Sequence, residues 1–374
     1  PPDPARVEEL RARAARAWAR SGADPSPHDI SVAAGRALDE DRAILPSAER
    51  EVLVQAVVDA ALGLGPLEPV FRDPAVTEVM VCGPARAYVE RGGRIEAVAR
   101  LFANERHLLH VIDRILAPLG RRVDESTPMA DARLPDGSRV NVVVPPLAVD
   151  GPALTIRRFG RVRHTSDDLV AGGALDERTM EALRAAVRAR RNVLVSGGTG
   201  SGKTTLLAAI CEAIPEHERV VTIEDAAELA LPLPHVVRLE ARPPSLEGAG
   251  AVTIRDLVRN ALRMRPDRII VGEVRGGEAI DMLAAMTTGH EGSLSTLHAS
   301  SPDDALRRLR LMAMMGGLDL PYAAVAEHVT SAVDVIAHCE RRPDGGRRVA
   351  AVVRVGRGGE IVELVAPGTS RGPA

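Results

Sequence analysis

One ten-residue stretch, SGGTGSGKTT at positions 196–205, constrains the fold more than any other part of the chain. It fits the pattern G-x-x-x-x-G-K-[ST], whose fixed places are filled by Gly197, Gly202, Lys203 and Thr204. An apolar run at 192–195 predicts a buried strand before it, and 206–210 predicts a helix after it. A strand, a glycine loop and a helix start in this order predict a phosphate-binding loop.

The residue types of this loop suit a triphosphate. Glycines let the backbone turn tightly and bring N–H groups close to phosphate oxygens, and the helix start adds unpaired N–H groups. We expect Lys203 at the β- and γ-phosphates and the Thr204 hydroxyl on Mg²⁺. The alternative, a glycine turn that binds nothing, is disfavoured by the flanking strand and helix. The predicted cofactors are therefore ATP and Mg²⁺, and the predicted nucleotide-binding residues of the loop are Gly197, Gly198, Thr199, Gly200, Ser201, Gly202, Lys203, Thr204 and Thr205.

Composition narrows the class of protein. A length of 374 residues predicts two or three domains, and 45% hydrophobic residues suit a globular protein. A net charge of −3 and 2% aromatic residues argue against a nucleic-acid groove, which needs basic and stacking side chains. Three widely separated cysteines predict no disulfide framework or zinc cluster and favour a reducing cytoplasm. No apolar run reaches membrane-spanning length, and the first residues do not resemble a signal peptide.

Changes of pattern along the chain predict its organisation. Helices at 5–20 and 47–62, the second with Ser47 as N-cap, form a helical appendage at 1–62; whether it is mobile stays open. An α+β domain at 63–159 precedes a linker at 160–173. Alternating strands and helices at 174–366 predict an α/β domain with a mostly parallel sheet. Residues 367–374 are expected to be disordered.

Within these domains, single elements can be predicted from periodicity and turn residues. Asp136-Gly137 predicts a hairpin between 131–134 and 139–144. The other strands expected in the α+β domain lie at 76–81, 87–90 and 154–159, with a helix at 106–116. In the later domain the strands are expected at 192–196, 220–223, 236–239, 268–271, 293–297, 333–338, 348–355 and 360–365, and the helices at 176–190, 203–214, 253–264, 278–288, 302–315 and 321–331.

Acidic residues follow two of the expected strands. Because ligands of parallel sheets bind at the carboxyl ends of the strands, Glu273 after 268–271 is expected to hold Mg²⁺ or orient water. Glu224 after 220–223 is expected to do the same, and Asp225 and Glu228 to complete the shell around the nucleotide. Acids are also favoured at the start of a solvated helix, which is the alternative for this second group. Which of Glu273 and Glu224 orients water stays open.

Histidines and arginines supply further candidates. His298 ends a predicted strand on the catalytic edge and is expected to sense the γ-phosphate. His290 lies between Gly289 and Gly292, which suggests a close backbone approach to a ligand; the two histidines are spaced too widely for a zinc pair. An arginine on the developing charge speeds phosphoryl transfer, and the candidates are Arg133, Arg139 and Arg157, each alternatively a surface charge. A helical stripe, Arg255, Arg259 and Arg263, predicts a subunit contact or a solvated face.

Together these motifs resemble one family. The phosphate loop, TIED at 222–225, RMRPDRIIVGEVRGGE at 263–278 and TGHEGSLSTLHA at 288–299 are similar to the secretion ATPases of type II and type IV secretion systems and type IV pili. LGPLEP at 64–69, TEVMV at 77–81 and DARLPDGSRVN at 131–141 resemble its TadA/CpaF branch, which assembles Tad (Flp) pili. The resemblance covers about 62–339.

The resemblance implies a cytoplasmic homo-hexamer with a RecA-like core, peripheral to the inner face of the membrane and acting on inner-membrane platform proteins. It implies that Lys203 and Thr204 are Walker A residues and Glu273 is the Walker B glutamate. Glu224 and Asp225 match the family's Asp box, His290 and His298 its His box, and Arg139 and Arg157, less surely Arg133, its γ-phosphate arginines. One departure is Thr287, where asparagine is expected. The family's Walker B box itself ends Gly-Glu, as Gly272 and Glu273 do here, without the aspartate that usually precedes the glutamate.

The predicted function is therefore ATP hydrolysis by a motor that powers Tad-type pilus assembly or related secretion, without direct contact to nucleic acid. Two alternatives remain in view. One is a conjugal-transfer or nucleic-acid motor on the same core, which DNA-stimulated hydrolysis would reveal. The other is a non-catalytic nucleotide-dependent scaffold, which the presence of both Lys203 and Glu273 disfavours.

Overall fold

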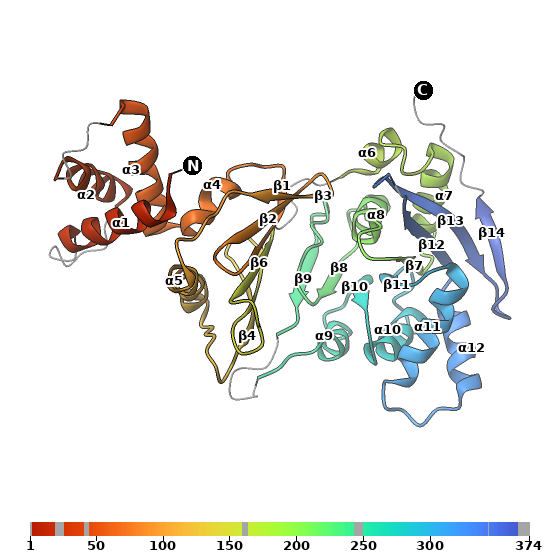
Figure 1. Ribbon diagram of the computed structural model, residues 1–374. Helices are drawn as coiled ribbons and strands as arrows, with labels where there is room; N and C mark the ends of the chain where they lie inside the picture. The colour runs from red at the N-terminus through yellow and green to blue at the C-terminus, as the bar shows by residue number, and fades with distance from the viewer. Residues whose placement is uncertain are drawn as a thin grey trace. The chain divides into compact units, whose positions relative to one another are not determined.

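The computed structural model describes residues 2–18, 26–40, 45–158, 164–242, 250–342 and 344–365. The chain divides into two compact units, Pro1–Gly160 and Arg161–Ala374, called here the N-terminal and the C-terminal unit. Figure 1 traces the course of each. No helix in the described ranges combines the length and apolarity needed to cross a bilayer. The predicted tail at 367–374 lies outside the described residues.

The N-terminal unit begins with helices α1 (Pro4–Trp18), α2 (Pro27–Glu40) and α3 (Ser47–Leu62). Apolar side chains at helical spacing, among them Leu10, Ile30 and Val57, bury a small core between them. The α2 helix was not predicted. The α3 helix has the predicted bounds, but Ser47 is its first helical residue and not its cap, because Pro46 takes the cap position and makes no side-chain bond there.

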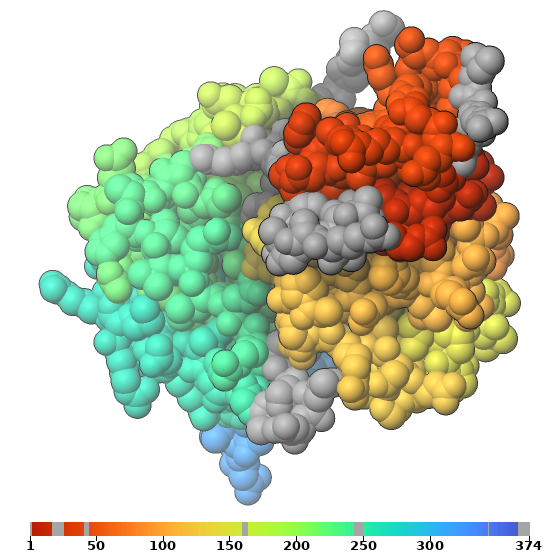
Figure 2. Space-filling view, turned by 90° about the vertical axis from the view of Figure 1, so that its left-hand side faces the viewer, coloured from red at the N-terminus to blue at the C-terminus, as the bar shows by residue number. Residues whose placement is uncertain are grey.

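These three helices belong to the same compact unit as the sheet that follows. Arg114 of α5 (Glu105–Leu116) donates to the carbonyls of Ala60 and Gly63 at the end of α3. His107 of α5 lies with Nε2 3.7 Å from Glu8 of α1. In the space-filling view the red helices lie directly against the orange and yellow surface of the unit (Figure 2). The helices therefore pack against the rest of their unit, and whether they move stays open.

An antiparallel sheet in the order β3-β2-β1-β6-β5-β4 follows in the N-terminal unit, with α5 packed on one face. The predicted hairpin is present as β4 and β5, and the edge strand β3 was missed. The strands are β1 (Val76–Cys82), β2 (Arg86–Arg91), β3 (Arg94–Val98), β4 (Met129–Arg133), β5 (Arg139–Val143) and β6 (Ala153–Arg157). Short helical turns are η1 (Gly65–Leu67), α4 (Glu68–Phe71) and η2 (Ala117–Leu119).

Three arginines meet on this sheet, at the end where β5 begins. Arg133 is the cross-strand partner of Arg139, and Arg139 is the partner of Arg157. Directly opposed residues point to the same face, so the three form one row, which ends beside Glu78 of β1. Their core-facing neighbours Val140 and Ile156 are buried, which places the arginine row on the face away from α5.

Within its described residues, the C-terminal unit holds a sheet in the order β14-β13-β12-β7-β11-β10-β8-β9. Neighbours from β12 to β9 pair parallel, and β13 and β14 are an antiparallel hairpin at one edge, as predicted. The strands are β7 (Val193–Gly197), β8 (Val220–Glu224), β9 (Val236–Glu240), β10 (Arg268–Val274), β11 (Leu294–His298), β12 (Val335–Arg341), β13 (Arg347–Val355) and β14 (Ile361–Val365).

Helices cover both faces of this sheet, as its buried central strands require (Figure 1). The first group, α6 to α8 with η3, packs on one face, and α9 to α12 pack on the other. The bounds are α6 (Ser166–Ala171), α7 (Glu177–Arg188), α8 (Lys203–Ile210), η3 (Cys211–Ala213), α9 (Ile254–Ala261), α10 (Glu278–Thr287), α11 (Pro302–Met314) and α12 (Tyr322–Ala332). Part of the predicted linker is thus helix α6, capped by Thr165 and bonded through Ser166 to Glu212; 160–163 lie outside the described residues.

A buried polar network closes the amino ends of the parallel strands. The Arg268 guanidinium is fully buried, donates to Glu218 at 2.5 Å, and also donates to the carbonyls of Val187 and Gly292. Asn192 donates to two helix-end carbonyls and accepts from the N–H groups of Gly292 and Ser293. The network fixes this edge of the sheet, opposite the phosphate loop.

Candidate functional site

The phosphate loop connects β7 to α8 at the carboxyl edge of the sheet. Gly197 has φ 151°, and a side chain there would meet the Cys339 carbonyl at 2.3 Å, so only glycine fits. Gly202 has φ 93° and leads into the helix. The Lys203 ammonium donates to the Gly198 carbonyl at 3.0 Å, and the Ser201 hydroxyl donates to the same carbonyl at 2.9 Å. The Gly198 carbonyl therefore binds the side chains of two residues of the same loop.

A β-bulge in β10 aims the key acid at this loop. Between Val271 and Val274 the ladder with β11 gains one residue on the β10 side, and Gly272 and Glu273 lie inside it. Two hydroxyls of β11 support the bulge: Ser295 donates to the Val271 carbonyl at 2.8 Å and Thr296 donates to the Gly272 carbonyl at 2.7 Å. The predicted strand ended at 271, before the bulge, and no role was predicted for the hydroxyls of Ser295 and Thr296.

Glu273 lies among three cationic or polar side chains. The Lys203 ammonium is 3.4 Å from His298 Nδ1, and His298 Nε2 is 2.9 Å from Glu273 Oε1. Because lysine can only donate, Nδ1 accepts and the ring proton resides on Nε2, facing Glu273. That ring N–H is misdirected, since Oε1 is buried and has no hydrogen-bond partner among the described residues. Oε1 therefore lies toward the loop and can still accept a hydrogen bond.

Arg275 holds the other oxygen of the same carboxylate. Its guanidinium donates twice to Glu273 Oε2, at 2.9 and 2.6 Å, and lies 3.5 Å from the Asp225 carboxylate. The sequence analysis did not single out Arg275. Its position two residues beyond Glu273 was the available signal, since alternate residues of a strand share a face, although the bulge makes that inference unsafe.

The electrostatics of the site favour an incoming anion. Burial lowers the pKa of Lys203, because few negative charges besides Glu273 offset the loss of solvent. Burial also lowers the pKa of His298, and the neighbouring Lys203 charge lowers it further. An anionic phosphate chain beside these two groups would raise both pKa values again and so stabilise the charged forms of Lys203 and His298.

Glu224 ends β8 with its side chain buried. One oxygen, Oε1, accepts from the N–H groups of Glu228 and Leu229 at 2.9 and 3.0 Å, and burial raises the pKa of this carboxyl. A side chain at position 272 would meet Glu224 Cγ at 2.7 Å, so Gly272 leaves space for this glutamate. The carboxylate anchors the segment after β8, and its metal-binding role stays a prediction.

The remaining acids follow Glu224. Asp225 is exposed beside Arg275, and Glu228 contributes its backbone N–H to the Glu224 carboxylate. Residues 225–235 form no helix, so the alternative of a solvated helix start is wrong. The ligand-binding roles of Asp225 and Glu228 stay predictions.

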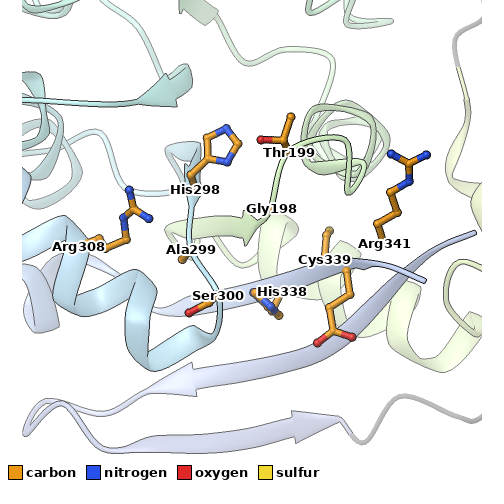
Figure 3. Close-up of a pocket in the computed structure, with 10 residues that line it drawn as sticks. Gly198, Thr199, His298, Ala299, Ser300, Arg308, His338, Cys339 and Arg341 are labelled. Carbon is orange, nitrogen blue, oxygen red and sulfur yellow. The ribbon is translucent and has the colours of Figure 1, made fainter. Parts of the chain in front are cut away.

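Beside the loop lies an open cavity of about 520 Å³. Figure 3 shows the His298 ring next to Thr199 and the Arg341 side chain on the other side of the loop in this view, with Arg308 reaching in from α11. The floor is formed by the ends of β11 and β12, and the cavity is lined by Gly198, Thr199, His298, Ala299, Ser300, Arg308, His338, Cys339, Glu340 and Arg341.

Several predicted residues do not join this cluster. His290 precedes β11 and lies at the amino edge of the sheet with Nδ1 3.2 Å from the Thr288 carbonyl, whereas His298 ends the strand. A five-residue strand separates the two histidines, so the structure does not bring His290 to the phosphate loop of its own chain, and its nucleotide-binding role stays a prediction. The arginine row Arg133, Arg139 and Arg157 belongs to the N-terminal unit. In the α9 stripe, Arg255 and Arg259 both pair with Asp281 of α10 and so brace two helices of one chain.

The residues of the site fit Mg²⁺. This cation prefers oxygen ligands and is commonly held by one or two protein groups together with phosphates. Thr204, at the second position of α8, and the unpartnered Glu273 Oε1 are oxygens of this kind. The predicted metal ligands Thr204 and Glu273 remain compatible with the geometry.

Comparison with known proteins agrees with this site. Residues 60–344 match the family model described as Type II/IV secretion system protein. A putative conjugal transfer protein of Mycobacterium tuberculosis is 42% identical over 304 residues, which cover 79% of this chain and 86% of that protein. The type IV secretion system protein VirB11 of Brucella suis is 34% identical over 331 residues, which cover 81% of this chain and 92% of that protein.

A solved structure supports the fold. The X-ray structure of the ATPase DotB from Legionella pneumophila matches with a TM-score of 0.54 at 21% identity, over 77% of this chain and 81% of that one. Likeness at this identity shows a shared fold, and the predicted RecA-like α/β core preceded by an α+β domain is confirmed. The chain belongs to the type II/IV secretion system protein family, a family of secretion ATPases.

Proposed function

We propose that the C-terminal unit hydrolyses ATP to ADP and phosphate, and that the chain works as a homo-hexameric motor on inner-membrane platform proteins at the cytoplasmic face of the membrane. The observation that carries the proposal is the line of Lys203, His298 and Glu273 at the lip of the phosphate loop. A lysine on the phosphates and an acid that can position water are groups that phosphoryl transfer to water uses, and the histidine lies between them.

Each residue has a part in this proposal. The loop N–H groups and Lys203 bind the β- and γ-phosphates. Glu273, fixed by Arg275 through Oε2, accepts a hydrogen bond from the attacking water through Oε1, and His298 Nε2 lies 2.9 Å from that oxygen. Bound Mg²⁺, held by Thr204 and Glu273, would neutralise charge on the phosphate oxygens. Arg139 and Arg157, with Arg133 beside them, supply positive charge to the γ-phosphate; the crowding of three arginines in one row is consistent with an anionic partner.

Replacement of Glu273 by glutamine tests the chemistry. We expect Glu273→Gln to lower kcat by about 10²–10⁴-fold while ATP still binds, because the amide keeps the shape and loses the basic oxygen. Lys203→Ala should abolish ATP binding. Glu291→Gln, exposed at the opposite edge, is the matched control and should leave both unchanged. Phosphate release and equilibrium binding of ATP are measured, and undiminished turnover in the glutamine variant would remove Glu273 from the mechanism.

The cargo is a separate question, with two candidates. The motifs favour Tad-type pilus assembly, and similarity to the putative conjugal transfer protein of Mycobacterium tuberculosis favours conjugal transfer. A strain carrying Lys203→Ala in place of the native gene distinguishes them. Loss of surface pili with normal DNA transfer supports the pilus motor, and the reverse supports the conjugal one. Hydrolysis stimulated by DNA with steep salt dependence would favour a nucleic-acid motor.

A further inference from the structure

Two arginines face each other beside the phosphate loop. Arg341 ends β12, Arg347 begins β13, and the two are cross-strand partners in the antiparallel ladder. Directly opposed residues point to the same face, and like charges in that arrangement are unfavourable. The neighbouring pair on the ladder, Glu340 and Arg348, is oppositely charged and ion-paired at 2.9 Å. The cross-strand pair of Arg341 and Arg347 therefore places two like charges opposite each other, whereas the neighbouring pair is oppositely charged.

Both arginines border the loop itself. A methyl group added at Gly200 would lie 3.8 Å from the Arg341 guanidinium, and one added at Gly202 would lie 3.3 Å from Arg347 Cδ. Arg341 also lines the cavity, on the far side of the loop from His298 in Figure 3. Two cationic side chains thus flank the loop at the edge that the described mechanism does not use.

The order of the strands indicates which end of a bound nucleotide lies at this edge. Glu273 and His298 come from β10 and β11 on one side of β7, whereas β12 and β13 follow on the other side. With the γ-phosphate at Glu273, we expect the nucleoside end of the nucleotide to extend toward β12 and β13. No Phe, Tyr or Trp is among the described residues that line the cavity; His298 lies on the β11 side, and His338 is buried against the Ser196 hydroxyl. A guanidinium plane is a surface on which a base can stack.

We propose that Arg341 and Arg347 bind the nucleoside end of the nucleotide, with the base stacked on a guanidinium. This assignment rests on the proposed ATP site. In this proposal the base binds beside β12 and β13, whereas the γ-phosphate reacts on the other side of β7, beside β11 and β10.

The test compares ATP with inorganic tripolyphosphate, which lacks the nucleoside. By titration calorimetry with Mg²⁺, we expect the double variant Arg341→Ala, Arg347→Ala to bind ATP at least about tenfold more weakly and tripolyphosphate within about twofold of the native chain. Arg348→Ala is the matched control and should change neither. An equal loss for both ligands, or no loss for ATP, overturns the proposal.

Lysine at both positions separates stacking from charge. The double variant Arg341→Lys, Arg347→Lys keeps the charges and loses the planar guanidinium, so ATP affinity should remain reduced while tripolyphosphate binding is retained. Full ATP affinity in this lysine variant contradicts stacking. The proposed ATP site fails independently if the native chain shows no specific ATP binding, or if Lys203→Ala binds ATP as tightly as the native chain.

Discussion

At the scale of single residues, the two oxygens of the Glu273 carboxylate have different environments. Arg275 takes up Oε2 with two hydrogen bonds, while Oε1 is buried and open. A carboxylate restrained in this way loses little conformational freedom when water arrives, which is the advantage of preorganisation. The motif predicted Glu273 and Lys203, because their spacing from glycines is local in sequence. It could not predict Arg275, Ser295 or Thr296, because their contacts depend on a bulge that the sequence does not mark.

The buried His338 makes stability depend on pH. Its Nδ1 lies 2.9 Å from the Ser196 hydroxyl, and burial lowers its pKa below the ordinary value of 6.5. As pH falls below 6.5 the unfolded chain takes up this proton before the folded chain does, so acidification favours unfolding. The stabilisation is complete above 6.5 and is lost as pH falls through the lowered pKa. We expect His338→Gln to reduce the difference in unfolding free energy between about pH 7.5 and about pH 5.

Denaturant unfolding followed by circular dichroism measures this difference in both proteins. His217→Gln, an exposed histidine on another turn, is the control and should keep the native pH dependence. A native-like pH dependence in His338→Gln would mean that other groups, such as His298 or His107, account for the effect.

At the scale of elements, the two edges of the large sheet are built differently. The amino edge holds the buried Arg268–Glu218 pair and the Asn192 bonds, whereas the carboxyl edge holds the glycines of the phosphate loop and the acids Glu224 and Glu273. Removal of one partner of a buried ion pair leaves an uncompensated charge. We expect Glu218→Gln to lower the free energy of unfolding by about 3 kcal/mol. Glu216→Gln, exposed on the same turn, should change it by less than about 0.5 kcal/mol.

Chemical denaturation of both variants measures this contrast. Equal stability of the two variants would show that Arg268 finds sufficient compensation in the carbonyls of Val187 and Gly292. ATP affinity should survive in a folded Glu218→Gln protein, since the pair lies at the edge away from the loop.

The alternating elements of the C-terminal unit were the most predictable part of the chain, because each buried strand is a continuous apolar run and each helix has an apolar face. The misses have physical reasons. β3 is an edge strand whose side chains are largely exposed, so its sequence carries little hydrophobic signal. Helix α2 begins at Pro27, directly after residues whose glycine and prolines predict a break. Helix α6 is six residues long, too short for its periodicity to be recognised.

At the scale of the whole molecule, the proposed mechanism draws on both compact units. The nucleotide loop belongs to the C-terminal unit and the arginine row to the N-terminal unit. The sequence analysis proposed the arginines by resemblance; the structure adds that three strands align them into one row. We propose that this row acts on the γ-phosphate of a bound nucleotide.

Alanine substitution of the row tests this cooperation. We expect Arg139→Ala and Arg157→Ala each to lower kcat by about 10²-fold or more while ADP affinity stays within about threefold, because the arginines act on the γ-phosphate that ADP lacks. Arg94→Ala, exposed on β3, is the control. Steady-state hydrolysis and ADP titration are the measurements, and an equal loss of ADP binding would place the row elsewhere on the nucleotide or reduce it to a structural role.

The absent side chain of Gly272 has a consequence for how such a site can be altered. The volume beside β10 that a residue at 272 would need is already filled by Glu224. Two neighbouring strands therefore compete for one space, and an acid can enter it from either strand but not from both. An aspartate at position 272 would therefore need a shorter side chain at position 224, so the two substitutions have to be made together.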